Sequence, residues 1–524
     1  LNLLFMEVKI FVKLLMLVIF FAKMIFVGIY SRKTVNDVNG FVLGGRSVGP
    51  WLTAFAYGTS YFSAVVFVGY AGQFGWKYGL SSTWIGIGNA LIGSLLAWVL
   101  LGRRTRVMTH HLEAKTMPEF FGKRYQSSGL RLISSLVVFI FLIPYTASVY
   151  SGLSSLFGMA FNFDYKWCVI IMALLTAVYV ILGGYMATAI NDFIQGIIML
   201  VGIVCVIIAV LNGQGGFMQA ITKLSDIPVD AKNTASALLN MKGPFVSFLG
   251  PDPKNLLGVI ILTSLGTLGL PQMVQKFYAI KSEKAVKTGT IVSTLFAIVI
   301  SCGCYFLGGF GRLFDSPLIY GANGAVKYDT IIPTMLATLP DVLIGIVVVL
   351  VLSASMSTLS SLVLTSSSTF TLDFLKASVV KKMSDKTQLL VMRLLIVVFI
   401  VVSVVLALNP PTFIAQLMGI SWGALAGAFI APFMYGLFWK KVTKASVWVS
   451  FVFGVGITVL NMFVPIFKSP INCGAAAMLG GLILVPLVSL VTPKLSEELQ
   501  NKIFSCYDEK VQVTKKVVLV EDEE

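Results

Sequence analysis

The chain consists mainly of long apolar runs separated by short polar segments. A helix needs about 20 apolar residues to cross the hydrocarbon core of a membrane. Runs of this kind predict thirteen membrane-spanning helices, at residues 11–30, 51–72, 81–101, 131–157, 167–182, 191–211, 256–275, 288–310, 341–372, 390–408, 412–438, 445–464 and 472–491. The pattern therefore predicts an all-α, polytopic membrane protein.

Two of these runs are interrupted near their middle. The second has a cluster of Gly, Thr and Ser at residues 58–63, and the seventh has two Gly and a Pro at residues 266–272. Gly favours unwinding of a helix, and Pro removes a backbone donor. The two runs are five apart, and transporters built from inverted five-helix repeats place broken helices at matching positions around a central binding site. Packing through small residues explains one break alone, but a matched pair favours a site.

The ninth run carries an unusual density of hydroxyl groups. Six of the nine residues from 353 to 361 are Ser or Thr, and Ser357, Ser360 and Ser361 share one helix face. Hard cations take oxygen ligands, and carbonyl groups freed by a broken helix would complete such a shell. Hydrogen bonding between helices is an equally good explanation of the density alone.

Asp192 is the acidic residue of interest, because it lies at the start of the sixth run. An ionisable group within a membrane span is costly and is a functional candidate by default. The alternative is that Asp192 caps a helix N-terminus. Lys23 and Arg393 also lie within runs, but their long stems reach toward the membrane surface, so no site role is expected of them.

Composition narrows the class of protein further. Hydrophobic residues make up 57% of the chain and charged residues 12%, against roughly 45–50% and about 25% in soluble proteins. This excludes soluble enzymes and disulfide scaffolds, and the six cysteines show no paired spacing. The net charge of +16 comes from basic residues between the apolar runs, so we expect a lipid bilayer and no nucleic acid as partner.

The basic residues also predict an orientation, because cytoplasmic loops are rich in Lys and Arg. With the N-terminus outside, the inward loops hold twenty Lys and Arg and the outward loops nine. The inward set includes Lys276, which directly follows the seventh run. We therefore expect a multi-pass protein of the inner (plasma) membrane with a cytoplasmic C-terminus. No nucleotide-binding loop is visible in the sequence, so ion coupling without an obligatory protein partner is expected.

Four motifs together resemble the sodium:solute symporter family, most closely its bacterial sodium/proline symporter branch. They are FVLGGRS at residues 41–47, TMPEFF at 116–121, Gly183 and Gly184 before Asp192, and MSTLS at 356–360. The resemblance extends from about residue 31 to residue 492. It implies sodium-coupled import of a small organic solute, such as the amino acid proline or a small carboxylate, by alternating access, and no enzymatic activity.

The resemblance also implies a LeuT-type core of two inverted five-helix repeats. The expected parts are an extra helix and cytoplasmic loop at 1–50, the first repeat at 51–211, an extracellular loop at 212–255, the second repeat at 256–438, two further helices at 439–491 and a cytoplasmic tail at 492–524.

Rival hypotheses for the function are a proton-coupled or uncoupled carrier of the same fold and a membrane-embedded solute sensor.

The resemblance implies that the cofactor is Na⁺. The first sodium would be bound by the carbonyls of Thr59, Phe62 and Ala354 and the hydroxyls of Ser357 and Thr358. A second sodium would use Ser357, Ser360, Ser361 and Asp192.

The expected solute contacts are Ser60, Tyr61, Ser63, Asn89, Thr267 and Gln272. The proline branch carries an aspartate at the position of Tyr61, and its loss makes proline a doubtful substrate. Ordinary helix packing is the alternative role of each of these residues. An amino acid or a small carboxylate as solute, and one or two sodium ions, are the alternatives that remain open at this point.

Overall fold

The computed structural model describes residues 2–32, 37–161, 164–229 and 241–508, of which residues 2–13 are described as backbone only. Nearly all of these residues are helical, as the all-α prediction requires. Residues 230–240 of the expected extracellular loop and 509–524 of the expected cytoplasmic tail lie outside the described residues.

Most of the helical segments lie in, or directly continue, the runs predicted to span the membrane. They are α1 (Asn2–Ser31), α3 (Pro50–Tyr61), α4 (Ala71–Tyr78), α5 (Thr83–Gly88), α6 (Arg103–His111), α8 (Ser128–Phe161), α9 (Tyr165–Gly213), α11 (Pro253–Gly266), α12 (Pro271–Ala279), α13 (Glu283–Ala297), α14 (Gly303–Gly309), α16 (Asp341–Thr369), α17 (Asp385–Leu408), α18 (Ile414–Phe438), α19 (Lys444–Phe463) and α20 (Pro470–Val491). Helices outside these runs are α2 (Val38–Leu43), α7 (Met117–Arg124), α10 (Phe217–Ser225), α15 (Ile331–Leu336) and α21 (Glu497–Phe504). Wider helical turns are η3 (Val65–Tyr70), η5 (Asn89–Leu96), η6 (Trp98–Gly102), η8 (Ile298–Cys302) and η12 (Phe370–Val379).

Among the described residues, eleven helical stretches are long and apolar enough to cross a membrane. Two of them are too long for one crossing: Val65–His111 has 47 residues and Tyr165–Gly213 has 49, each about 70 Å at 1.5 Å per residue. Each of these two therefore contains parts of two expected spans. Together with α3, the eleven stretches account for all thirteen expected spans.

The expected loop between the fifth and sixth spans is replaced by a sharp bend within α9. Gly184 has φ 53° and ψ −149°, a conformation that favours Gly because it has no Cβ. A Cβ at Gly184 would lie 2.9 Å from the Phe41 carbonyl oxygen, so the bend is also closely packed. A single glycine thus makes the turn that the sequence pattern assigned to a loop.

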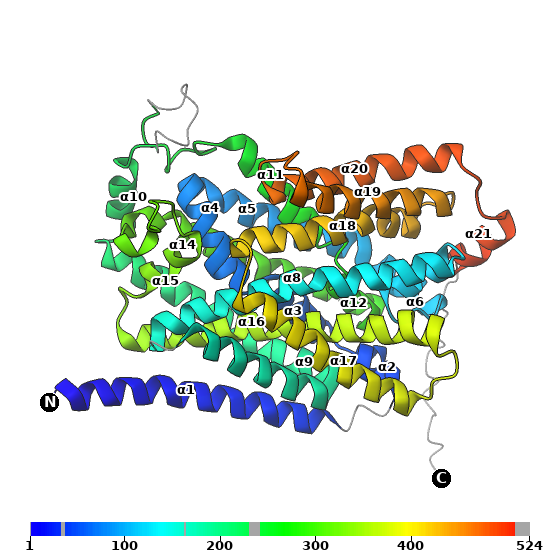
Figure 1. Ribbon diagram of the computed structural model, residues 1–524, viewed down its shortest axis with the longest axis horizontal. Helices are drawn as coiled ribbons and strands as arrows, with labels where there is room; N and C mark the ends of the chain where they lie inside the picture. The colour runs from blue at the N-terminus through cyan, green and yellow to red at the C-terminus, as the bar shows by residue number, and fades with distance from the viewer. Residues whose placement is uncertain (1, 33–36, 162–163, 230–240, 509–524) are drawn as a thin grey trace, which may run out of the picture.

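The helices lie side by side, with most axes along the long dimension of the molecule (Figure 1). α1 lies along one flank and packs on α9 and α16, whereas α18, α19 and α20 form the opposite flank. α10 and α15 lie at the end where α1 begins, and α2, α6 and α21 lie at the other end. α16 runs through the interior, and every residue from 350 to 369 is buried.

Both predicted interruptions are present. α3 ends at Tyr61, Phe62 has the non-helical values φ −107° and ψ 95°, and the helical turns resume at Ala64. α11 ends at Gly266, and α12 begins at Pro271, a residue suited to the first turn of a helix because it lacks an N–H. Each break leaves carbonyl groups without the donors that a continuous helix would supply.

Candidate functional site

The broken end of α3 lies against the hydroxyl-rich part of α16. The Ser357 hydroxyl lies 3.1 Å from the Thr59 carbonyl oxygen and 2.9 Å from that of Ala354. The Thr358 hydroxyl lies 3.3 Å from the Thr59 carbonyl oxygen and 3.1 Å from that of Ala354. Two hydroxyl and two carbonyl oxygens therefore converge where α3 loses its helical hydrogen bonds.

This cluster contains four of the five ligands expected for the first sodium. The fifth, Phe62, lies at the break itself, directly after the end of α3. Thr59, Phe62, Ala354, Ser357 and Thr358 are all fully buried. Neutral oxygen donors held close together in a dry interior suit a small hard cation, because they replace its hydration shell without requiring a counter-charge. The donor set therefore fits Na⁺.

The residues expected for a second sodium are arranged differently. The Ser360 hydroxyl donates to the Ser357 carbonyl oxygen at 2.8 Å. The Ser361 hydroxyl lies 2.8 Å from the Ser60 hydroxyl and accepts a hydrogen bond of 2.9 Å from the Lys276 ammonium group. Asp192 is fully buried, and neither of its carboxylate oxygens has a hydrogen-bond partner among the described residues.

Asp192 lies within α9, eight residues after the bend at Gly184, and so it is not the helix cap considered as an alternative. The charges that act on its carboxylate are those of Lys276 on α12 and Lys23 on α1. The charges of two lysines therefore act on this buried carboxyl group.

The sequence-based interpretation of these two lysines was wrong. Lys276 was assigned to a cytoplasmic loop, but the break at residues 267–270 lets α12 continue to Ala279 and carry the lysine inward, where it is 2% exposed. Lys23 was expected to reach the membrane surface, yet its ammonium nitrogen is buried. Both lysines act electrostatically on the carboxyl group of Asp192, although neither donates a hydrogen bond to it.

The six expected solute contacts are all buried, each at most 1% exposed. They are Ser60, Tyr61, Ser63, Asn89, Thr267 and Gln272. The Tyr61 hydroxyl donates to the Thr263 carbonyl oxygen at 2.6 Å, which joins the broken end of α3 to the last turn of α11. This contact brings the two interrupted helices together.

Asn89 and Thr267 meet at Ser264. The Ser264 hydroxyl donates to the Asn89 side-chain oxygen at 3.2 Å, and the Thr267 hydroxyl lies 3.2 Å from the Ser264 carbonyl oxygen. Ser63 is used locally, since its hydroxyl accepts from the Val65 N–H at 3.2 Å. Gln272 differs from the others, because both atoms of its buried amide lack a hydrogen-bond partner within the described part of the chain.

Two aromatic residues at this centre were not predicted. Trp422 on α18 stacks on Tyr61, with ring centroids 6.1 Å apart, and Tyr145 on α8 meets Trp422 edge to face at 5.9 Å. The Trp422 indole nitrogen is buried without a partner among the described residues. In the sequence, the available signal was that Trp422 is a large residue among the mostly small and apolar residues of α18.

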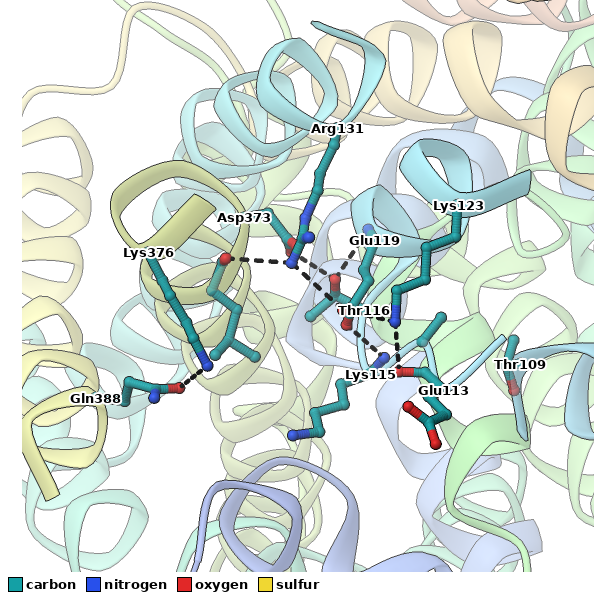
Figure 2. Close-up of polar contacts among 12 residues, drawn as sticks. Thr109, Glu113, Lys115, Thr116, Glu119, Lys123, Arg131, Asp373, Lys376 and Gln388 are labelled. Carbon is teal, nitrogen blue, oxygen red and sulfur yellow. Dashed lines mark hydrogen bonds and ion pairs between the residues drawn. The ribbon is translucent and has the colours of Figure 1, made fainter. Parts of the chain in front are cut away.

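A charged network lies near the far end of α16 (Figure 2). Asp373 on η12 is fully buried and accepts a hydrogen bond of 2.7 Å from Arg131 Nε on α8. The Thr116 hydroxyl donates to the same carboxylate and also caps α7 by accepting from the Glu119 N–H. Glu119 in turn lies 3.4 Å from Arg131 and 3.2 Å from Lys123. The motif at 116–121 therefore joins α7 and α8 to the end of α16.

Comparison with known proteins identifies the family. The model of the sodium:solute symporter family matches residues 41–454. The chain belongs to the sodium:solute symporter family. Membership makes it a sodium-coupled symporter of a small solute and a multi-pass membrane protein, and it is a transporter and not an enzyme.

Curated members of this family are similar over most of their length. The osmoregulated proline transporter OpuE of Bacillus subtilis is 28% identical over 91% of this chain and 94% of its own. Sodium/proline symporter 2 of Staphylococcus saprophyticus is 30% identical over 85% of each chain. The sodium/proline symporter of Staphylococcus aureus is 30% identical over 92% of this chain and 93% of its own.

Solved structures show the same fold. A Na⁺-coupled sialic acid symporter in a substrate-bound, outward-open state has a TM-score of 0.73 at 19% identity and covers 92% of this chain and 99% of its own. The nucleobase-cation-symport transporter Mhp1, in a closed conformation, has a TM-score of 0.51 at 14% identity, over 88% of this chain and 97% of its own. The fold of this family member is therefore the LeuT type, with additional helices at both ends.

Proposed function

We propose that this symporter imports a small organic solute together with a sodium ion held where α3 breaks against α16. The observation that carries the proposal is the approach of the Ser357 and Thr358 hydroxyls to the Thr59 carbonyl oxygen, at 3.1 and 3.3 Å. The carbonyl oxygens of Ala354 and Phe62 would complete the coordination of the ion. A bound sodium would hold the end of α3 against α16 more firmly than these hydrogen bonds, because each ligand then contacts a full positive charge.

The proposed coupling follows from thermodynamic linkage. If sodium orders the broken end of α3 and raises the affinity for solute, the solute must raise the affinity for sodium by the same factor. One sodium moving inward down 100 mV supplies about 2.3 kcal/mol, which is about fortyfold in accumulation of a neutral solute. The sodium concentration gradient would add to this.

The proposed organisation places the first repeat at residues 51–211 and the second at 256–438. It places the protein in the inner (plasma) membrane, with the N-terminus outside and the C-terminus in the cytoplasm. The distribution of Lys and Arg supports this orientation. α10 and α21 lie at opposite ends of the molecule, as an extracellular loop and a cytoplasmic tail would (Figure 1).

For the solute, we propose a small amino acid or a small carboxylate, with proline tested first because three relatives are named as proline transporters. Ser60, Tyr61, Ser63, Asn89, Thr267 and Gln272 are the proposed contacts. Trp422 joins them because it stacks on Tyr61. Tyr61, at the position of the branch's aspartate, supplies ring area and no charge, so the solute would be selected by shape and neutral hydrogen bonds.

The test is uptake by the purified protein in liposomes. An inward sodium gradient should drive accumulation of labelled L-proline, or of a label identified by competition among small amino acids and monocarboxylates. Replacement of sodium by potassium should abolish accumulation. Uptake that follows a pH gradient and ignores sodium would favour a proton-coupled carrier, and equilibration without accumulation would favour an uncoupled one. Solute binding without any transport would favour a sensor.

The second sodium expected at Asp192, Ser357, Ser360 and Ser361 is not tested by these observations and is not part of this proposal. The ammonium group of Lys276 already contacts one of these expected ligands.

A further inference from the structure

The Lys276 ammonium group contacts Ser361, one of the four residues expected to bind a second sodium. Its nitrogen is 2.9 Å from the Ser361 hydroxyl oxygen and 5.2 Å from the centroid of the Tyr185 ring. Both groups favour a cation, because the Ser361 hydroxyl oxygen can act as a ligand and the face of the Tyr185 ring attracts positive charge. Lys276 is 2% exposed, so this ammonium has exchanged water for these contacts.

The balance of charge points the same way. Asp192 is the acidic group whose charge acts on Lys276, and the charges that act on Asp192 are those of Lys276 and Lys23. With all three groups ionised, two lysines and one carboxylate would carry a net charge of +1. A sodium ion added beside Asp192 would raise this to +2 in a desolvated region, which is strongly unfavourable.

The contacts of Lys276 also link the helices that a bound sodium ion would link. Lys276 on α12 donates to Ser361 on α16, and the Ser361 hydroxyl lies 2.8 Å from that of Ser60 on α3. The ammonium therefore joins both broken helices to α16. A sodium ion in this place would make the same connection, but only while it was bound.

We propose that Lys276 is a tethered cation that takes the place of a second sodium, so that this symporter couples one sodium ion to each solute. The count of one rests on the proposed first site at Ser357 and Thr358, whereas the exclusion of a second ion rests on Lys276 and Asp192. Because the lysine cannot leave, its charge crosses no gradient and supplies no driving force. It fixes the stoichiometry instead.

Equilibrium binding of radioactive ²²Na⁺ to the purified protein tests the proposal without knowledge of the solute. The wild type should bind one sodium per molecule, and Asp192→Asn should leave that count unchanged. Lys276→Gln, which removes the charge at similar length, should raise the count to two, because one added sodium restores the net charge of the wild type. Lys276→Gln combined with Asp192→Asn should return it to one.

Two lysine variants serve as controls. Lys276→Arg keeps the positive charge, and Lys284→Gln removes an exposed charge on α13, so both should bind one sodium. A wild-type count of two would overturn the proposal, and so would a correctly folded Lys276→Gln protein that still binds one. The wild-type count decides even if Lys276→Gln fails to fold.

Failure of the first sodium site gives a different result. A wild-type protein that binds no sodium would contradict the site at α3 and α16. So would a wild-type protein that binds one sodium with an affinity that Thr358→Ala does not change. The tethered-cation proposal would still require Lys276→Gln to gain one ion, and it would be overturned if no ion were gained.

Discussion

Arg131 and Asp373 form an ion pair, with Nε and Oδ1 2.7 Å apart, between the first turns of α8 and the η12 extension of α16 (Figure 2). Asp373 is fully buried, whereas the Arg131 side chain is 23% exposed. The same helix that carries Ser357 and Thr358 is therefore held at its far end by a charge pair. Opening of that end requires either the pair to break or α7, α8 and η12 to move together.

Asp373→Asn should weaken this end of the molecule. The change preserves the shape of the side chain but leaves Arg131 with a neutral partner, and removing one member of a buried pair costs about 3–5 kcal/mol. The partial exposure of Arg131 reduces this to about 2 kcal/mol. Thermal unfolding in detergent should show the loss, whereas Lys123→Ala, which removes a rim contact to Glu119, should change stability little. Equal effects of the two variants would contradict a special role for the buried pair.

Gly75 and Gly308 set the distance between α4 and α14. A Cβ at Gly75 would lie 1.9 Å from the Gly308 carbonyl oxygen, and backbone atoms cannot move aside as a flexible side chain can. Gly75→Ala should therefore destabilise the protein by more than about 2 kcal/mol through overpacking. Gly456→Ala on α19 is the matched control, because nothing lies within 4 Å of its added methyl group. A Gly75→Ala protein as stable as this control would show that the two helices separate freely.

Tyr61→Phe tests the contact between the two broken helices. The variant keeps the ring that stacks on Trp422 and removes the hydroxyl that donates to the Thr263 carbonyl oxygen. A buried carbonyl left without a donor costs about 1–3 kcal/mol, so unfolding should occur at lower temperature. Tyr30→Phe is the control, since Tyr30 is 65% exposed. If Tyr61→Phe matched the control, the hydroxyl would not hold the helices together.

The periodic and compositional features of the chain were enough to predict much of this structure. The thirteen apolar runs, the breaks near Thr59 and Thr267, and the hydroxyl face of Ser357 all depend on residues close together in sequence. Each therefore leaves a local signal, and the family motifs are equally local. The convergence of Thr59, Ala354, Ser357 and Thr358 follows once the fold is known.

The features that sequence reasoning missed depend on contacts between distant residues. Lys276 and Ser361 are 85 positions apart, so a lysine just beyond an apolar run resembles an ordinary loop lysine. The bend at Gly184 leaves no polar segment, because one glycine suffices to make it. Trp422 and Tyr61 come from opposite halves of the chain, and nothing in either local sequence indicates their stacking.

The sodium dependence of transport in α16 variants tests the central claim most directly. Ser357→Ala and Thr358→Ala each remove one proposed ligand, and a contact to a charged group is worth about 1.5–3 kcal/mol, so half-saturating sodium should rise about tenfold or more. Ser355→Ala is the control, because this buried hydroxyl of the same helix donates to the Val351 carbonyl oxygen at 2.6 Å and belongs to no proposed site. It should leave half-saturating sodium within about twofold of the wild type. Unchanged half-saturating sodium in both Ser357→Ala and Thr358→Ala would contradict the account.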